Sequence, residues 1–269
     1  MPISRRNFVS LAAASLVSSA VAQLPEHGSA GVPPAVARAS RPRLRVTAPI
    51  KAIAFDALVI FDPRSVFALV DKLFPGRGSQ LSNEWRTRQF EYTWLRVAAG
   101  RYSDFWHVTQ DALVYAAKKV KLELSPRNRD ALMRAYLELK AWPDVVPALT
   151  ELRKTGYRLA LLSNFTPSML DWCIRSAELQ GMFEQVLSTD QAKTFKPTPS
   201  AYQLGINSLK LRKQEILFAA FAGWDAAGAK LFGYPTVWVN RLNAPAEELG
   251  ATPDATGVGL ADLVHYLKR

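Results

Sequence analysis

The sequence predicts an α/β fold, with a doubly wound parallel sheet and an inserted helical cap. Five runs of strand length are predominantly apolar, which is typical of strands buried on both faces of a sheet. These runs span residues 50–55, 157–162, 185–187, 216–222 and 236–239. Helical patterns separate the runs, and this alternation indicates parallel strands joined by crossover helices.

The segment between the first two runs, residues 65–139, contains no strand candidate and has the pattern of several helices. An insertion of this size directly after the first strand predicts a cap that closes a site and excludes water. We therefore assign residues 50–64 and 140–269 to the α/β core and residues 65–139 to the cap.

One helix of the cap carries two neighbouring stripes of side chains at helical spacing. The stripes are Leu81, Trp85, Arg88, Tyr92 and Leu95, and beside them Arg86, Phe90, Trp94 and Val97. Two interpretations are compatible: the helix packs inside the cap and against a partner subunit, or its Arg86 and Phe90 face looks onto the mouth of the sheet. The two apolar faces predict a homodimer formed through this helix.

The first residues have the pattern of an export signal. Arg5-Arg6 precedes a weakly apolar stretch that ends at Ala20-Val21-Ala22, a small-residue cleavage pattern. Residues 1–22 are therefore predicted to be a twin-arginine signal peptide, recognised by the twin-arginine export machinery of a bacterium, and the mature protein is expected in the periplasm. The stretch is too short and too rich in Ser and Ala for a stable membrane anchor. The alternative is a disordered tail that happens to contain two arginines.

Residues 23–49 contain five prolines among Ala, Ser and Arg without any helical or alternating period, which predicts a linker. The chain has 269 residues and is 49% hydrophobic, enough for one substantial core and an added subdomain. Cys173 is the only cysteine, so no disulfide can form within the chain.

The net charge of +11 is unevenly distributed. Residues 1–51 contain seven Lys or Arg residues and one acidic residue, which leaves the remaining chain with only +5. Nucleic-acid binding would call for a concentrated basic stripe, so this mildly basic surface favours small anionic substrates and argues against nucleic acid.

Four polar side chains follow the ends of successive predicted strands. Asp56 comes after the first run, Ser163 after the second, Lys196 after the third and Asp225 after the fourth. Because the carboxyl ends of parallel strands form one edge of the sheet, where ligands bind in such folds, we expect these side chains to converge. Asp56 is the predicted nucleophile, and Lys196 is expected to keep it ionised.

Each position also has an ordinary structural interpretation. Asp225 is expected to cap a helix over residues 226–232 if it has no catalytic role. Most lysines beside a proline, as Lys196 is, lie on the solvated surface.

Ser163 and Asn164 precede Thr166-Pro167, which predicts a helix start. Free N–H groups there favour an anion that Ser163 and Asn164 would also bind, but an N-cap without a ligand has the same spacing.

Other reaction classes fit less well. A phosphoryl-transfer enzyme usually needs a second carboxylate two residues after its aspartate to help hold Mg²⁺, and that position is Leu58. No serine lies in a Gly-x-Ser-x-Gly elbow, and the only histidines are His27, His107 and His265, which disfavours a Ser-His-Asp hydrolase. No metal ion or other cofactor is expected.

With these motifs, the sequence resembles the haloacid dehalogenase superfamily, and within it the type II (S)-2-haloacid dehalogenases. The matching segments are Ala54-Phe55-Asp56, Phe61-Asp62, Trp85-Arg86, Glu91-Tyr92-Thr93-Trp94-Leu95-Arg96, Leu162-Ser163-Asn164, Lys196-Pro197 with Tyr202, Trp224-Asp225 with Gly228-Ala229, and Trp238-Val239-Asn240-Arg241. The resemblance implies a metal-independent hydrolase that cleaves the carbon–halogen bond of short 2-haloalkanoic acids through an aspartyl ester.

The resemblance also implies roles for individual residues. Asp56 would attack the halogen-bearing carbon, Lys196 would neutralise Asp56, and Asp225 would orient Lys196 and help position water. Ser163 would contact the substrate carboxylate or the nucleophile.

The remaining implied contacts are with the halide and the substrate. Arg86 and Asn164 would receive the halide, and an always-charged guanidinium suits an anion expelled into a dry pocket. The substrate contacts would also include Phe90, Phe105, Trp224 and Tyr202.

Three departures from the family pattern lie close to the predicted site. The segment after Asp56 lacks the family's Tyr-Gly-Thr and is one residue shorter, and alanines occupy positions 220 and 222, where the family has Ser and Asn. Each lost hydrogen-bonding partner in a buried site costs roughly 1 to 3 kcal/mol. An exported binding protein, or a hydrolase of altered activity, therefore remains the alternative function, and a Mg²⁺-dependent phosphatase is a weaker one.

Overall fold

The computed structural model describes residues 49–268. The predicted signal peptide and all of the linker except Pro49 lie outside the described residues. No helix among residues 49–268 combines the length and the apolar character that crossing a membrane requires.

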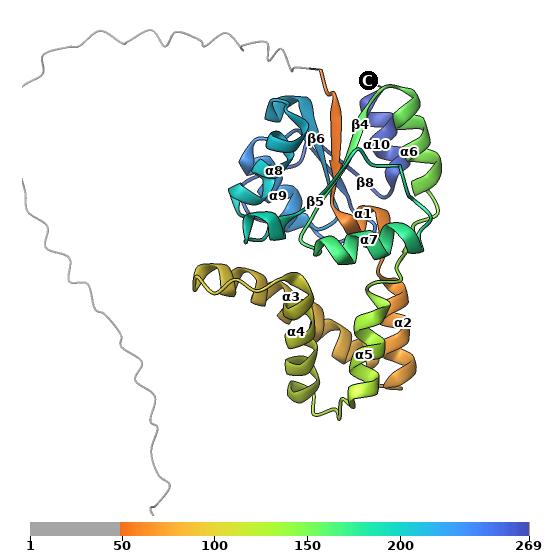
Figure 1. The fold of residues 1–269 in the computed structure, drawn as a ribbon, viewed down its shortest axis with the longest axis vertical. Coiled ribbons are helices and arrows are strands. Elements are labelled where there is room, and N and C mark those ends of the chain that lie inside the picture. The colour runs from red at the N-terminus through yellow and green to blue at the C-terminus, as the bar shows by residue number, and fades with distance from the viewer. Residues whose placement is uncertain (1–48, 269) are drawn as a thin grey trace, which may run out of the picture. The chain divides into compact units, whose positions relative to one another are not determined.

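The core is a six-stranded sheet in which every neighbouring pair is parallel (Figure 1). The strand order is β5-β4-β1-β6-β7-β8, so β1 lies inside the sheet between β4 and β6. The strands are β1 (Ala52–Phe55), β4 (Arg158–Ser163), β5 (Gln185–Ser188), β6 (Ile216–Ala220), β7 (Thr236–Val239) and β8 (Ala255–Gly257). The predicted α/β fold with a parallel sheet is confirmed.

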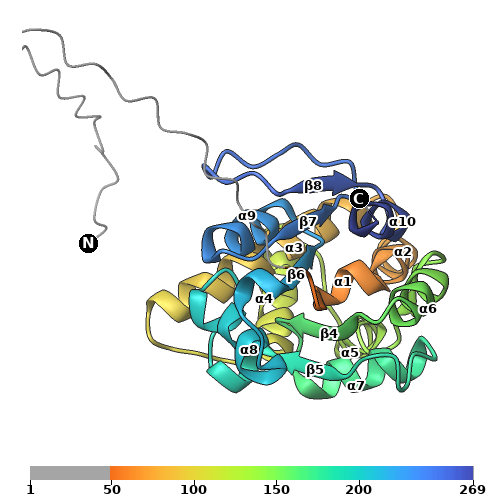
Figure 2. The same cartoon turned by 90° about the horizontal axis from the view of Figure 1, so that it is seen from above.

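Side chains of the strands alternate between two buried clusters, one on each face of the sheet. In β1, for example, Ile53 and Phe55 belong to one cluster and Ala52 and Ala54 to the other. Helices α6 (Val145–Lys154), α7 (Pro167–Ser176) and α10 (Leu260–Leu267) add apolar side chains to the first cluster, and α8 (Pro199–Leu209) and α9 (Gly223–Phe232) to the second. Figure 2 shows α8 and α9 on one side of the sheet and α6 and α10 on the other. Because helices cover both faces of the sheet, the strand sequences are predominantly apolar and do not alternate with polar residues.

Five of the six strands coincide with predicted runs, with differences at their ends. The first strand begins at Ala52 and not at Ile50, and the fourth ends at Ala220, two residues before the predicted end. The sixth strand, β8, was not predicted, because Ala255-Thr256-Gly257 is a short, partly exposed edge segment without an apolar run.

The predicted helix over residues 226–232 begins earlier, at Gly223. Asp225 therefore lies inside the first turn of α9 and is not its N-cap, a position that Ala222 occupies without a side-chain hydrogen bond. The Asp225 carboxylate is instead turned toward other side chains, described below.

Residues 65–139 contain helices and no strand, as predicted (Figure 1). The helices are α2 (Arg64–Leu73), α3 (Gly78–Ala98), α4 (Phe105–Lys119) and α5 (Pro126–Ala135). Asp104 and Ser125 cap α4 and α5 through side-chain hydrogen bonds. Where the chain leaves and re-enters the core, β2 (Phe61–Asp62) and β3 (Lys140–Ala141) form a short antiparallel pair.

Both faces of α3 make contacts among the described residues, and packing against a partner subunit stays a prediction. On the first face Trp85 is fully buried and its indole N–H donates to the Thr109 carbonyl of α4 (2.8 Å). On the second, the Phe90 ring lies 4.8 Å from the ring of Trp224 in the core. This second face therefore lies over the carboxyl edge of the sheet, and the cap borders the predicted site.

Candidate active site

Asp56 lies where β1 gives way to the short helix α1 (Ala57–Ile60). Its backbone N–H donates to the Ala219 carbonyl of β6 (2.9 Å), which continues the sheet pairing up to this residue. Its side-chain Oδ2 accepts a hydrogen bond from the Leu58 N–H (3.0 Å) and so caps α1. The carboxylate is thus held at the end of a central strand, and its side chain is partly exposed.

Lys196 joins two carboxylates from different strand ends. Its Nζ lies 2.7 Å from Asp56 Oδ1 and 2.5 Å from Asp225 Oδ2, and the Lys196 side chain is 1% exposed. Burial alone would lower the lysine pKa, but Asp225 and Asp56 raise it above its ordinary value. Lys196 is therefore a buried cation in contact with Asp56, and the alternative of a solvated surface lysine is wrong.

Burial raises the pKa of Asp225 to about 6, against opposing contributions from Lys196 and from the Tyr202 hydroxyl. Tyr202 donates to Asp225 Oδ1 (2.7 Å), and burial beside this carboxylate raises the pKa of Tyr202. Asp225 thus has one oxygen on Lys196 and the other on Tyr202. This arrangement fixes the lysine ammonium in front of Asp56.

The end of β4 supplies two further groups. Ser163 Oγ accepts a hydrogen bond from the Phe165 N–H (3.1 Å), which leaves the hydroxyl proton available for an acceptor. Asn164 Oδ1 accepts from the Lys196 N–H (2.9 Å) and from the Thr189 hydroxyl (3.2 Å), so its amide N–H groups are the donors that remain for an anion. Thr166 caps α7 as predicted, accepting from the Met169 N–H (3.2 Å).

Aromatic side chains from the cap meet the core beside these polar groups. Phe90 of α3 lies against Trp224, and Phe105 of α4 stacks on Phe165, with ring centroids 5.4 Å apart. Phe105 also lies 6.2 Å from Phe195, the residue before Lys196. The predicted apolar residues are therefore brought to the boundary between cap and core.

Two predicted residues are placed differently from the expected contacts. Tyr202 is fully buried behind Asp225, so its position corrects the expected substrate contact to a positioning role. Arg86 is exposed, donates to Asn83 (2.6 Å) and lies 4.9 Å from the Phe67 ring, all within the cap. Its predicted halide contact stays a prediction.

Sequence reasoning missed Tyr102 and Asp190, which connect the cap to the loop carrying Lys196. Neither residue lies at the end of an apolar run or in a helical stripe, and the only signal was that Asp190 closely follows the third predicted strand.

Within residues 49–268, no three His, Cys, Asp or Glu side chains are grouped so that they could hold a metal ion. Asp56 and Asp225 face each other across the Lys196 ammonium, and Leu58 takes the position of an additional acid. The two carboxylates are thus bridged by one buried positive charge.

Comparison with protein families gives a match to the haloacid dehalogenase-like hydrolases over residues 50–233. The chain belongs to this family. Similar relatives include an (S)-2-haloacid dehalogenase of Pseudomonas sp. (strain YL), 42% identical over 206 residues, covering 76% of this chain and 89% of that protein. Another is haloacetate dehalogenase H-2 of Moraxella sp. (strain B), 39% identical over 219 residues, covering 81% and 98%.

Solved structures of haloacid dehalogenases share the fold. The L-2-haloacid dehalogenase RSc1362 superposes with a TM-score of 0.81 at 41% identity and covers 82% of this chain and 100% of its own. The L-2-haloacid dehalogenase of Xanthobacter autotrophicus with chloropropionic acid covalently bound superposes with a TM-score of 0.75 at 34% identity, covering 81% and 98%.

The departures from the dehalogenase pattern are visible in the structure. The Leu58 backbone N–H supports the Asp56 carboxylate where the expected threonine is missing. Ala220 is fully buried and Ala222 is the N-cap of α9, and neither side chain can donate or accept a hydrogen bond. Among the described residues, the hydrogen bonds to the Asp56 carboxylate come from the Lys196 ammonium and the Leu58 N–H.

Proposed function

We propose that the protein hydrolyses the carbon–halogen bond of short 2-haloalkanoic acids through an ester on Asp56, without a metal ion. The observation that carries this proposal is the Asp56–Lys196–Asp225 arrangement, in which a buried lysine ammonium lies 2.7 Å from the Asp56 carboxylate at the end of a central strand. The named dehalogenase relatives support it.

The reaction needs two displacements. An Asp56 oxygen attacks the halogen-bearing carbon, and the carbon–halogen bond breaks with its electron pair leaving on the halide. Water then attacks the carboxyl carbon of the ester, which releases a 2-hydroxy acid and a proton and restores Asp56. Because the carboxylate is already the charged form, the first step depends on alignment and desolvation more than on a general base.

The surroundings of Asp56 are suited to these charges. Lys196 stabilises the aspartate before attack, and Asp225 keeps the lysine in place while water enters. The Asn164 amide and the Arg86 guanidinium are the proposed halide acceptors, and Arg86 would have to exchange its Asn83 contact for the halide.

The test is halide release from a panel of 2-chloro, 2-bromo and 2-fluoro acids, including both enantiomers of each chiral acid. Asp56→Asn should abolish release, and Asp171→Asn, a matched change in a surface ion pair, should not. Turnover in ¹⁸O-water should place the label in the Asp56 carboxylate, detected by peptide mass spectrometry. Halide release that persists in Asp56→Asn would contradict the proposal.

A second candidate is a binding protein that kept the pocket but lost the chemistry. The specific observation in its favour is the loss of hydrogen-bonding side chains at Ala220 and Ala222. Calorimetric binding of a 2-haloacid, without halide release by the wild type, would favour this candidate. Strong Mg²⁺-dependent release of phosphate from an ester would instead favour a phosphatase.

We also propose export through the twin-arginine machinery to the periplasm, on the basis of Arg5-Arg6 and the small-residue stretch that follows. Replacing both arginines by lysine should retain the protein in the cytoplasm of a bacterial host. Periplasmic recovery of that variant would contradict the export route.

We also propose that the protein forms a homodimer through α3. Trp94 and Leu95 are 48% and 42% exposed on that helix, a large apolar surface for a monomer to leave in water. Light scattering should give the mass of two chains, and the double substitution of both residues by serine should give one. A monomeric wild type would refute the dimer.

A further inference from the structure

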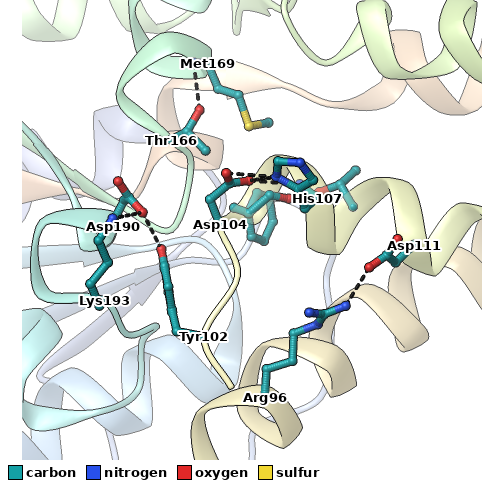
Figure 3. A network of polar contacts seen from close by, with 11 residues as sticks. Arg96, Tyr102, Asp104, His107, Asp111, Thr166, Met169, Asp190 and Lys193 are labelled. Carbon is teal, nitrogen blue, oxygen red and sulfur yellow. Dashed lines mark hydrogen bonds and ion pairs between the residues drawn. The ribbon is translucent and has the colours of Figure 1, made fainter. Parts of the chain in front are cut away.

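A hydrogen bond connects the cap to the core beside the active site. Tyr102, in the segment between α3 and α4, donates its hydroxyl proton to Asp190 Oδ1 (2.8 Å), as Figure 3 shows. Asp190 lies in the short 3-10 helix η1 (Thr189–Ala192), which directly follows β5. Within residues 49–268, this is the one hydrogen bond between a side chain of residues 65–139 and a side chain of the core.

The core side of this contact is tied to the active site. Thr189, next to Asp190, donates to Asn164 Oδ1, and the Lys196 N–H donates to the same oxygen. The Asp190 N–H donates to Ser188 Oγ (3.2 Å), so Ser188 caps the short helix that carries the carboxylate. Asp190 is therefore connected by hydrogen bonds to the loop that carries the predicted catalytic lysine.

The cap side of the contact has a separate aromatic part. The Tyr102 ring lies 5.2 Å from Phe195, the buried residue before Lys196. Three residues later, Phe105 packs on both Phe165 and Phe195. Removing only the Tyr102 hydroxyl would leave this ring packing in place, so the polar and apolar parts can be tested independently.

The charges make the hydrogen bond a strong one. Burial works against the charged carboxylate, but hydrogen bonds from Tyr102 and Lys193 hold the pKa of Asp190 below its ordinary value. Burial and the bond to Asp190 raise the pKa of Tyr102, which keeps its proton on the phenol. Lys193 Nζ approaches Asp190 Oδ1 to 3.0 Å from the other side (Figure 3). A hydrogen bond to an ionised acceptor is about twice as strong as a neutral one.

We propose that Tyr102 and Asp190 are positioning residues that form a latch, which holds the cap closed over the substrate pocket before substrate binds. The inference rests on the proposed dehalogenase function and names the contact that keeps its site assembled. Because binding requires the closed form, loss of the latch multiplies the apparent affinity by the fraction of molecules that close spontaneously, which weakens binding. Once substrate is bound its own contacts hold the cap, so the rate of the bound complex changes less.

The first experiment is steady-state halide release by Tyr102→Phe, using the 2-haloacid that the wild type converts best. We expect KM to rise about tenfold, the effect of one charge-assisted hydrogen bond, with kcat changed less than twofold. The matched control is Tyr157→Phe, a partly buried tyrosine of the core for which no hydroxyl hydrogen bond is found among the described residues. A rise in KM with an unchanged melting temperature distinguishes a latch from a general loss of stability.

The second experiment is a double-mutant cycle with Asp190→Ala. The double variant should have the same KM as each single variant, because either change removes the same bond. Asp190→Asn, which still offers a neutral acceptor to Tyr102, should give a KM between those of the wild type and Asp190→Ala, because the bond loses its charge assistance. A wild-type KM in Tyr102→Phe, or independent effects that multiply in the double variant, would overturn the proposal.

A readout without substrate separates this proposal from the proposed function. Hydrogen exchange followed by mass spectrometry should show faster exchange in residues 99–106 and 189–195 of Tyr102→Phe than in the wild type or in Tyr157→Phe. Faster exchange in Tyr102→Phe, together with a wild type that releases no halide, would leave the latch standing and refute only the dehalogenase. Equal exchange in all three proteins would refute the latch whatever the reaction is.

Discussion

Replacement of Tyr202 by phenylalanine should move the acid limb of the pH–rate profile. Asp225 must be ionised to hold Lys196, and burial raises its pKa to about 6 from an ordinary value of 3.8. At pH 5 only about one-tenth of the molecules would carry the charged form, compared with more than nine-tenths at the ordinary value. The wild type should therefore lose activity as the pH falls through about 6.

The hydroxyl of Tyr202 contributes to this value because it donates to the charged form of Asp225 at 2.7 Å. A hydrogen bond to a charged group contributes about 1.5 kcal/mol, and 1.36 kcal/mol corresponds to one pKa unit. Removing a donor to the carboxylate favours its protonated form. The pKa of Asp225 therefore rises, and the acid limb of the profile moves to higher pH. We expect the midpoint to move from about 6 to about 7 in Tyr202→Phe.

The assay is kcat/KM for halide release between pH 4.5 and 9, with circular dichroism to confirm that the protein stays folded throughout. Tyr234→Phe is the matched control, because the Tyr234 hydroxyl donates to the Tyr202 backbone carbonyl (2.7 Å) and not to Asp225. Its limb should coincide with that of the wild type. A wild-type limb near pH 4, or an unmoved limb in Tyr202→Phe, would refute the assigned role of Asp225.

Two further predictions concern the same part of the core. Lys196→Met should lower halide release at least a thousandfold and the free energy of unfolding in urea by about 3 to 5 kcal/mol, because two carboxylates lose their buried partner. The same change at the exposed Lys118 should alter neither quantity, and a stable, active Lys196→Met variant would disprove the pairing. Gly228→Ala should lower the free energy of unfolding by about 1 to 3 kcal/mol. A Cβ there would lie 2.6 Å from Pro197 Cβ and 2.7 Å from the Tyr202 hydroxyl. A melting temperature equal to that of the wild type would show that this packing is not tight.

Much of the fold was predictable because both faces of the sheet are buried. A strand such as β7 is then buried along its whole length and predominantly apolar, and Thr236–Val239 coincides with its predicted range. The β8 edge strand has no such requirement, and residues 255–257 gave no signal. The predicted start of α9 was wrong for a different reason. Aspartate is a residue type common at N-caps, but the Asp225 carboxylate is bound by Lys196 and Tyr202 instead.

Sequence position by itself determined which polar residues stand at the carboxyl edge of the sheet. Asp56, Lys196 and Asp225 each follow a predicted strand, and parallel pairing brings such ends to one edge whatever the details of packing. Only the tertiary structure decided how the side chains are oriented: that Tyr202 lies behind Asp225, that Arg86 is turned to Asn83, and that Tyr102 reaches Asp190 across 88 positions of the chain. Local patterns record burial and helix or strand period, whereas a contact between distant residues depends on how the cap packs on the core, which no short segment of sequence contains.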